Sequence, residues 1–275
     1  MRTAVLIQAH KNEKYIEYLA KNNTDVAFYV HIDKKNKSPY QYLMRLNLSN
    51  LIVLEDRVSV FWGGSSQIHA TLRLLEAAYA NVEHKFFHLI SAECVPLKSF
   101  SKIESEWMED ESLNFIESRK RKETEWRLKI RVFHSNTAWM RTIPGRVINR
   151  VSRVLGSIYN FSGMDEDLFY FGSQWFSINR ELVSRILYVN KEMDFFDEFN
   201  GISCADEHAF NIFVKKFDIK TIDSNKRFII FDGVSPKYLN YEELKELTSL
   251  KNEDFWFARK VTPATAKVFL SGNTN

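Results

Sequence analysis

The sequence contains little cysteine. Cys94 and Cys204 are its two cysteines in 275 residues, and they lie far apart without companion residues at the spacing of a metal site. This scarcity argues against a disulfide framework and a zinc site, and it favours a reducing compartment. No apolar run is long enough for a signal peptide or a membrane span. We therefore expect a cytoplasmic protein.

The two common phosphate-binding loops are missing as well. Neither Gly-x-Gly-x-x-Gly nor Gly-Lys-Ser/Thr occurs, although the pair Gly63-Gly64 would let the backbone approach a ligand closely. The net charge of +3 is too small to imply binding of nucleic acid. No linker, repeat or low-complexity tract divides the chain, so we expect a single domain.

An acidic metal-binding pair is absent from the strand ends. In many nucleotide-sugar enzymes an Asp-x-Asp pair at such a position holds a divalent cation on the diphosphate, because hard cations favour oxygen ligands. Asp165-Glu166-Asp167 has the spacing but follows a glycine in a loop-like stretch, where a solvated turn is the simpler interpretation. A diphosphate would then need cations from side chains. Arg259 and Lys260, adjacent in an aromatic stretch, are either surface residues or such a clamp.

Short apolar runs alternate with helical patterns along the chain. These runs are typical of buried parallel strands, and a strand, a helix and a second strand form a βαβ unit. The sequence therefore predicts an α/β fold. The expected strands are 3–9, 26–33, 51–54, 86–90, 114–117, 169–178, 221–223 and 227–231.

Polar residues follow the first two of these strands. His10 comes directly after the first strand and Asp33 ends the second. Ligands of open α/β sheets bind at the carboxyl ends of strands, so both residues stand where a nucleotide could be held. For Asp33, capping the turn into Lys34-Lys35 is an equally good interpretation.

Residues 203–214 combine a helix start with two carboxylates. Ser203 and Asp206 form a capping-box pattern, and Glu207 lies on the same helical face as Phe210 and Val214. A carboxylate aimed inward and kept ionised by a helix N-terminus suits a general base. The alternative is that both carboxylates merely complement the helix N-terminus, and this stretch alone favours that alternative.

A second helix, near residues 145–159, is basic and amphipathic. Its apolar residues share one face, and Arg146, Arg150 and Arg153 lie opposite. We expect the apolar face to pack on the domain with the arginines in water; docking on an anionic membrane surface is the alternative. Trp175, in an aromatic strand pattern, could line an acceptor cleft, although core packing is more common for such a residue.

Several segments, in order along nearly the whole chain, together resemble one family, the core-2/I-branching β-1,6-N-acetylglucosaminyltransferases. These make up glycosyltransferase family 14, which also includes peptide xylosyltransferases. The matching segments are His31-Ile32-Asp33-Lys34-Lys35, Trp62-Gly63-Gly64-Ser65, Phe87-His88-Leu89-Ile90-Ser91, Pro96-Leu97-Lys98-Ser99, Gly172-Ser173-Gln174-Trp175, Asn179-Arg180-Glu181, Asp206-Glu207-His208 and Phe257-Ala258-Arg259-Lys260.

The resemblance implies a GT-A fold, an inverting displacement and no metal cofactor. The donor would be a UDP-sugar, with residues 1–112 as the nucleotide-binding half and residues 113–275 as the acceptor and catalytic half. Glu207 matches the catalytic base. The residues matched to the donor side are His10 and Asp33 near the uridine and Arg227, Arg259 and Lys260 near the diphosphate. The residues matched to the acceptor side are Glu117, Gln174, Trp175 and Asp206.

The chain also departs from the family pattern. Ala92-Glu93-Cys94 stands where the family usually has Gly-x-Asp, which leaves the donor sugar open between N-acetylglucosamine and xylose. The secretory-pathway disulfides and membrane anchor are lacking, which is consistent with a bacterial-type enzyme of surface polysaccharide or lipopolysaccharide assembly, cytoplasmic or peripheral on the inner membrane face. Its acceptor would be a glycan or a lipid-linked saccharide. The alternatives are a metal-dependent GT-A transferase of another family and a non-catalytic glycan- or membrane-binding protein.

Overall fold

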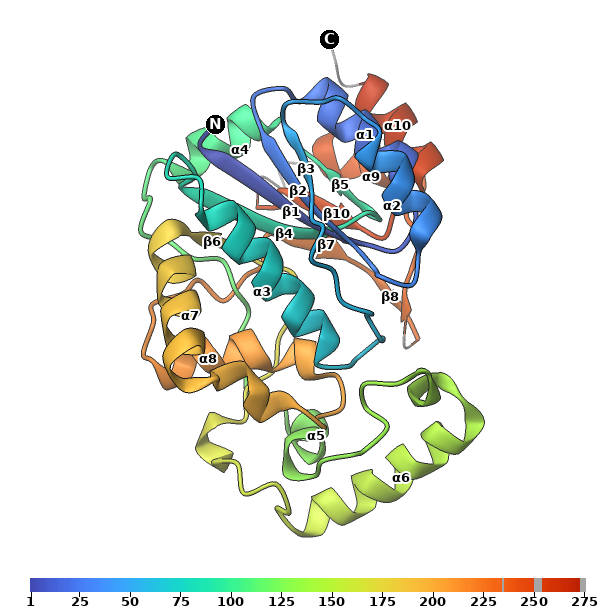
Figure 1. Ribbon diagram of the computed structural model, residues 1–275, viewed down its shortest axis with the longest axis vertical. Coiled ribbons are helices and arrows are strands. Elements are labelled where there is room, and N and C mark those ends of the chain that lie inside the picture. The colour runs from blue at the N-terminus through green and yellow to red at the C-terminus, as the bar shows by residue number, and fades with distance from the viewer. Residues whose placement is uncertain (234, 250–253, 273–275) are drawn as a thin grey trace.

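A computed structural model describes residues 1–233, 235–249 and 254–272, and its centre is a five-stranded sheet (Figure 1). The strand order is β3-β2-β1-β4-β6, and β6 alone runs antiparallel to its neighbour in this sheet. The α/β prediction is confirmed. The strands are β1 (Thr3–Ala9), β2 (Ala27–Ile32), β3 (Leu51–Val53), β4 (Phe86–Ser91) and β6 (Ser177–Asn179).

Helices cover both faces of this sheet because its strands are apolar on both sides. Ala4 and Leu6 of β1 face one core, and Val5 and Ile7 face the other. The first core is closed by α3 (Ser66–Tyr79), α7 (Arg180–Met193) and α8 (Ala209–Lys216). The second is closed by α1 (Glu13–Asn22), α2 (Lys37–Met44), α4 (Phe100–Trp107), α9 (Tyr241–Ser249) and α10 (Pro263–Gly272).

A smaller sheet brings the C-terminal part of the chain beside β4. Its order is β5-β10-β7, from β5 (Cys94–Pro96), β10 (Phe257–Arg259) and β7 (Arg227–Ile229). Arg259 pairs with Cys94, so the residues after β10 return to the carboxyl end of β4. A two-stranded ribbon joins β8 (Phe231–Asp232) to β9 (Ser235–Pro236).

The predicted strands have a mixed outcome. The first four are confirmed to within one residue at each end, and 227–231 contains β7 and the start of β8. The predictions for 114–117, for 221–223 and for most of 169–178 are wrong, because these segments pair only through isolated bridges at Phe115, Phe171 and Ile222. Asn114 illustrates the reason, since its side chain, not its backbone, accepts the Asn179 N–H at 2.9 Å.

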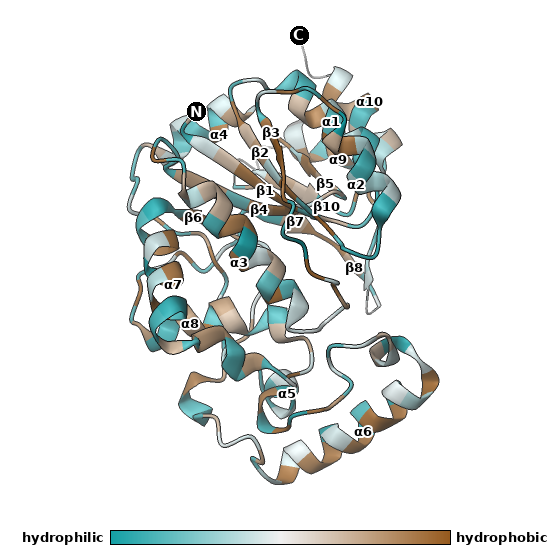
Figure 2. Ribbon diagram, in the orientation of Figure 1, coloured by the Kyte–Doolittle hydropathy of each residue, from teal (hydrophilic) through white to brown (hydrophobic). Residues whose placement is uncertain are grey.

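Two helices stand apart from the sheet, at the lower end of the molecule in Figure 1. They are α5 (Glu125–Lys129) and α6 (Ile143–Ile158), which pack against each other. Figure 2 shows apolar residues along α6 although it lies far from the sheet. The prediction that this helix packs its apolar face on the domain is wrong, because Gly145, Ser152 and Gly156 are its buried residues. None of the described helices is both long and apolar enough to cross a membrane.

Candidate functional site

The carboxyl edge of the central sheet gathers polar residues from three strands. Gln8 of β1 lies opposite His31 of β2 on one side and Ser91 of β4 on the other. The residues that leave these strands, His10 and Asp33 among them, therefore start from one edge. This is the edge at which open α/β sheets bind ligands.

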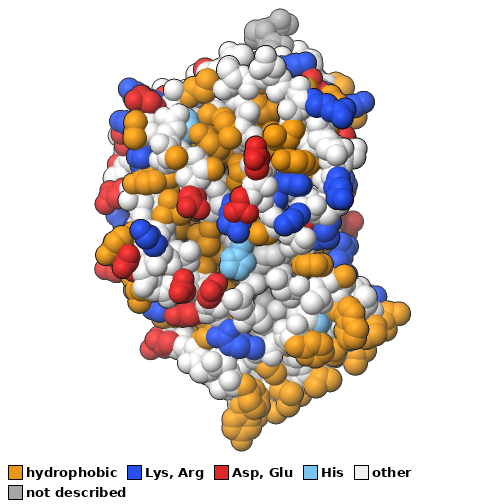
Figure 3. All heavy atoms as spheres, in the orientation of Figure 1, with side chains coloured by type: hydrophobic (Ala, Val, Ile, Leu, Met, Phe, Trp, Pro, Cys, Tyr) orange, Lys and Arg blue, Asp and Glu red, His pale blue; other side chains and the backbone are white. Residues whose placement is uncertain are grey.

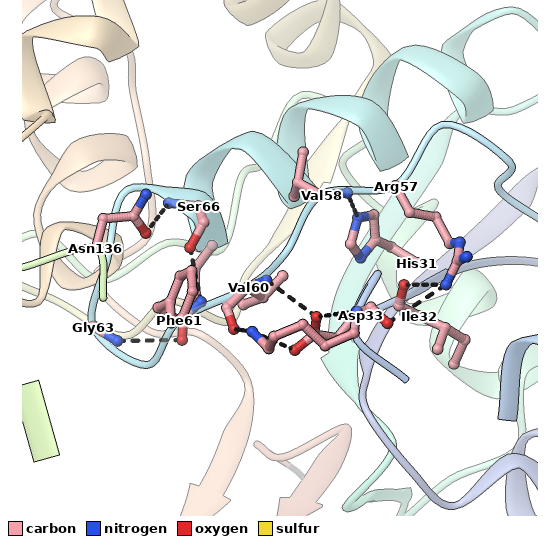
Figure 4. Close-up of polar contacts among 12 residues, drawn as sticks. His31, Ile32, Asp33, Arg57, Val58, Val60, Phe61, Gly63, Ser66 and Asn136 are labelled. Atoms are coloured by element: carbon pink, nitrogen blue, oxygen red, sulfur yellow. Dashed lines mark hydrogen bonds and ion pairs between the residues drawn. The ribbon is translucent and has the colours of Figure 1, made fainter. Parts of the chain in front are cut away.

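Asp33 holds the loop that connects β3 to α3. Its Oδ1 accepts hydrogen bonds from the backbone N–H of Lys35 at 3.0 Å and of Val60 at 3.3 Å, and its Oδ2 lies 3.0 Å from Lys35 Nζ (Figure 4). Burial lowers the pKa of His31 to about 4, so the neutral ring accepts the Val58 N–H at 3.0 Å. The predicted turn-capping role of Asp33 is thus confirmed, and its contact with a nucleotide stays a prediction.

The same loop links this edge to the segment before α6 and to the turn that carries Glu207. At the N-terminus of α3, Ser66 donates its N–H to Asn136 Oδ1 at 3.3 Å (Figure 4). Gly63, with a positive φ of 69°, accepts the Ala205 N–H at 3.3 Å. A Cβ at Gly64 would lie 2.4 Å from Asn136 Oδ1, so the glycine is needed for this close approach.

An ion pair with Glu93 holds Lys260 at the carboxyl edge. Its Nζ is 3.0 Å from Glu93 Oε2, and Tyr238 donates a hydrogen bond to Glu93 Oε1 at 2.8 Å. Burial acts to raise the pKa of Glu93, but the bonds from Lys260 and Tyr238 outweigh it and hold the pKa below its ordinary value. Partial burial and the charge of Lys11 lower the pKa of the nearby His10.

Arg259 connects this cluster to the predicted acceptor residues. It donates a hydrogen bond to Ser91 Oγ, and its guanidinium lies 4.7 Å from the centre of the Trp175 ring. Trp175 is itself buried, with 8% of its surface exposed. The core packing expected for Trp175 is therefore confirmed, its ring also contacts the Arg259 cation, and its contact with an acceptor stays a prediction.

Arg227, predicted at the diphosphate, lies in the core between the two sheets. Its guanidinium donates to Ser177 Oγ at 2.7 Å and to the carbonyl oxygens of Leu89, Phe176 and Asn225. Burial lowers its pKa to about 9. Both of its terminal nitrogens are thus committed to the protein, and the structure does not bring them to the open edge of the sheet.

Glu207 belongs to a short 3-10 turn, Ala205–Glu207, just before α8. The prediction of a capping box at Ser203 is wrong, because α8 begins at Ala209 and no side chain caps it. Glu207 Oε2 accepts a hydrogen bond from Arg127 at 2.7 Å. The pair is partly buried, and Glu207 Oε1 has no hydrogen-bond partner among the described residues.

Asp206 lies behind Glu207 at the end of a chain of glutamines. Gln67 donates to Asp206 Oδ2 and also to Gln174 at 3.1 Å, and Gln174 donates to Gln8 at 2.9 Å. Burial and the charge of Glu207 raise the pKa of Asp206 to about 8. Both effects favour the protonated form of Asp206, and the glutamines join the Glu207 turn to the end of β1.

Glu117 lies next to the same turn. Its Oε2 accepts the Ser173 N–H at 3.0 Å, and Gly172 donates its N–H to the Glu207 carbonyl oxygen at 3.0 Å. The predicted acceptor residues Glu117, Gln174 and Asp206 are thus linked through hydrogen bonds to the Glu207 turn or to the 172–175 segment that contacts it. Their contact with an acceptor stays a prediction.

The contacts form one continuous path from the cations to the candidate base. The path runs through Lys260, Glu93, Ser91, Arg259, Trp175, Gln174, Gln67, Asp206, Glu207 and Arg127. Carboxylates at one end and partly exposed cations at the other can remove a proton and stabilise an anionic leaving group.

Sequence reasoning missed several members of this path. Gln8, which accepts a hydrogen bond from Gln174 of the path, lies one residue before the end of the first strand and could have been found by the strand-end rule that gave His10. Gln67 follows the Gly63-Gly64 pair by three residues, which was a weaker signal. Arg127 lies in a stretch with many basic residues, and nothing in the sequence distinguished it from them.

The described residues 1–233, 235–249 and 254–272 contain no group of three or more His, Cys, Asp or Glu side chains that could hold a metal ion. Asp165 and Asp167 lie at a 3-10 turn, where Asp165 Oδ1 accepts the Asp167 N–H at 3.0 Å. This hydrogen bond matches the turn predicted for Asp165-Glu166-Asp167.

Comparison with known proteins identifies the family of this chain. No curated protein matches the chain. A sequence model of the family described as core-2/I-branching enzyme matches residues 6–249, which include β1 to α9 and the whole path except Arg259 and Lys260. The chain therefore belongs to the core-2/I-branching enzyme family and is a glycosyltransferase.

Proposed function

We propose that this protein is an inverting glycosyltransferase that moves a sugar from UDP to a hydroxyl of a glycan acceptor without a metal ion. N-acetylglucosamine is our first choice for the sugar and xylose the second. We place the reaction in the assembly of a bacterial surface polysaccharide or lipopolysaccharide. The family membership supports the glycosyl transfer and a glycan acceptor.

One observation carries this proposal: a partly exposed carboxylate, Glu207, is joined to two adjacent cations, Arg259 and Lys260, by one chain of side-chain contacts. Glu207 is fixed through Oε2 by Arg127, and Oε1 is left to accept a proton. Arg127 is partly buried beside Glu207, so this charged hydrogen bond fixes the carboxylate in one orientation.

The carboxyl edge of the central sheet, which we call the donor edge because we place the sugar donor there, carries an excess of positive charge. Two carboxylates, Asp33 and Glu93, interact there with four cations. The cations are Lys11, Lys35, Arg259 and Lys260. This excess can neutralise part of a diphosphate without a divalent cation. Because Arg227 is committed to carbonyl oxygens, we assign the diphosphate to Arg259 and Lys260 and give Arg227 a supporting role behind them.

The reaction would be a single displacement. Glu207 takes the proton of the acceptor hydroxyl, and the oxygen of that hydroxyl attacks the anomeric carbon of the sugar. The bond from this carbon to UDP breaks, and the electron pair of that bond leaves with the diphosphate. Most of the acceleration would come from positioning and charge stabilisation, and the base would contribute about 10²–10⁴-fold.

Replacing Glu207 tests the central assignment. Hydrolysis of a panel of UDP-sugars, with water as acceptor, gives the readout without a known acceptor. We expect Glu207→Gln to lower turnover of the best donor by at least 10²-fold, because the amide cannot take a proton. UDP affinity, measured by titration calorimetry, should stay within about threefold, since we place Glu207 away from the diphosphate. Glu192→Gln, on the exposed surface of α7, is the matched control.

Excess EDTA separates the proposal from its alternatives. We expect wild-type turnover in EDTA to equal turnover with Mn²⁺. A strict need for Mn²⁺ would identify a metal-dependent transferase instead. A protein that leaves every UDP-sugar intact over long incubation, yet binds glycan, would be non-catalytic.

A further inference from the structure

Helix α6 is attached to the protein by its smallest residues. A Cβ on Gly145 would lie 1.8 Å from the Trp139 carbonyl oxygen, and one on Gly156 would lie 2.8 Å from that of Trp126. Ser152 lies between them and is buried. Only the side of α6 that carries these small residues allows the backbones to approach so closely. The side of α6 with larger residues could not pack in the same position.

The apolar residues of α6 consequently point into solvent. They recur at helical spacing and form one stripe, which we call the α6 apolar face. Each of its side chains is between 42% and 71% exposed, and Figure 3 shows hydrophobic side chains gathered at this end of the molecule. The α6 apolar face consists of Ile143, Val147, Val151, Val154, Leu155 and Ile158. A contiguous exposed apolar surface of this kind marks a docking site.

Arginines line one flank of this face. Successive residues of a helix are rotated by about 100°, which places Arg146, Arg150 and Arg153 together on the side of the stripe away from the small residues. All three are exposed, and none has an ion-pair partner in the part of the chain that the structure describes. The hollow between Ile143, Val147, Arg146 and Arg150, of about 220 Å³, shows charge and apolar surface side by side.

The surrounding segment has only one sign of charge. From residue 126 to residue 164 the chain contains seven Lys and Arg and no Asp or Glu. Exposed aromatic pairs flank α6 at both ends: Phe133 and Trp139 lie before it, with ring centres 6.5 Å apart, and Tyr159 and Phe161 after it, 5.9 Å apart. Aromatic side chains with a polar atom, such as Trp139 and Tyr159, favour the boundary between water and hydrocarbon.

We propose that the α6 apolar face docks α6 in the plane of an anionic lipid bilayer, with the three arginines on the lipid phosphates. The combination of an exposed apolar stripe, a basic flank and interfacial aromatics matches a helix that lies on a membrane. A second copy of the chain is a poorer occupant, since its own segment 126–164 offers no Asp or Glu to pair with the arginines. The docking does not depend on the proposed transferase activity.

Vesicle flotation tests this inference with the full-length protein. The vesicles are pure phosphatidylcholine or phosphatidylcholine mixed with phosphatidylglycerol. We expect binding to the anionic vesicles, weakened by added salt, and little binding to the neutral ones. The triple variant Arg146→Gln, Arg150→Gln, Arg153→Gln should lower the partition coefficient roughly 100-fold, because each basic residue near an anionic surface contributes about fivefold.

Two further variants sharpen the result. Val147→Ser, Val151→Ser, Val154→Ser should lose binding while all three arginines remain. The matched control is Arg45→Gln, Lys191→Gln, Lys220→Gln, which removes the same charge from exposed positions elsewhere and should bind like the wild type. Trp139 emission should shift to shorter wavelength on docking, and Trp139→Phe should lose that shift.

Three results would overturn the proposal. The first is a wild-type protein that stays unbound to anionic vesicles at low salt. The second is equal loss of binding in the arginine variant and its control. The third is a dimer in sedimentation analysis that the serine variant abolishes, because a second copy would then cover the α6 apolar face.

Discussion

At the scale of single residues, two basic side chains that the sequence treats alike have different surroundings. Lys260 is partly exposed and paired with Glu93, whereas Arg227 is buried and donates to Ser177 and to three carbonyl oxygens. The distinction matters because a cation serves a leaving diphosphate only where the diphosphate can reach it.

Replacing each of these cations should therefore affect a different property. Lys260→Gln should raise the dissociation constant of UDP about 10- to 100-fold, as expected for loss of a charged hydrogen bond, with little effect on unfolding. Arg227→Gln should lower the free energy of unfolding by about 3 kcal/mol or more, because buried carbonyl oxygens lose their donors. Calorimetry and urea denaturation measure the two effects. Weaker UDP binding with an unchanged free energy of unfolding in Arg227→Gln would show instead that Arg227 binds the diphosphate.

Asp206 should make stability depend on pH. Its pKa is about 8 in the folded protein, against an ordinary value of 3.8, so the folded state keeps a proton that the unfolded chain releases. The stabilisation is complete below the ordinary pKa and is lost as pH rises toward 8, by at most about 1.4 kcal/mol per pH unit. Asp206→Asn should flatten this decline, as measured by urea denaturation at about pH 6 and about pH 8.

The exposed Asp218 provides the control for this measurement. Its backbone has a positive φ of 48°, which asparagine adopts readily, so Asp218→Asn should keep the wild-type dependence on pH. Equal slopes in wild type and Asp206→Asn would show that Asp206 is ionised in the folded protein.

At the scale of elements, the segment 172–175 holds the candidate base in place. Gly172 donates to the Glu207 carbonyl oxygen, and a Cβ there would lie 2.3 Å from the Glu117 carbonyl oxygen and 2.4 Å from Asn211 Nδ2. No side chain fits without moving the segment, and the Glu207 turn would move with it.

Gly172→Ala should consequently lower turnover by about 10²-fold, since a displacement of about 1 Å in a catalytic group has effects of this size. UDP affinity should change little. Gly272→Ala is the control, because its Cβ would meet only Tyr241 Oη at an ordinary 3.4 Å. Wild-type turnover in Gly172→Ala would show that the segment does not position Glu207.

At the scale of the whole molecule, the donor edge joins parts of the chain that are more than 200 residues apart. The ion pairs of Glu93 with Lys11 and Lys260 connect the loops after β1, β4 and β10. A ligand bound there should stabilise the entire fold, because it binds the folded chain and not the unfolded one.

UDP should thus raise the melting temperature, also in excess EDTA. At a hundred times its dissociation constant it would add about 2.7 kcal/mol to the free energy of unfolding. A thermal-shift panel of UDP, UDP-N-acetylglucosamine and UDP-xylose would rank the donors. Stabilisation by UDP only after addition of Mn²⁺ would contradict the metal-free reading of the site.

The sequence determined the central sheet and the residues at its edge. Short continuous apolar runs between helical patterns favour buried parallel strands, and parallel strands align their carboxyl ends, so His10 and Asp33 could be placed in advance. The ordered motifs also led to the family that the comparison confirmed over residues 6–249.

Only the tertiary structure decided which groups meet and which stay exposed. Periodicity shows that the apolar residues of α6 share a face, but packing against Trp126 and Trp139 turned that face to solvent. Arg227, expected at the diphosphate, is likewise buried in the core, and Arg127, for which the sequence predicted no role, reaches Glu207 across 80 residues. A local pattern fixes neighbours on one element, whereas partners distant in sequence are selected by the packing of the whole chain.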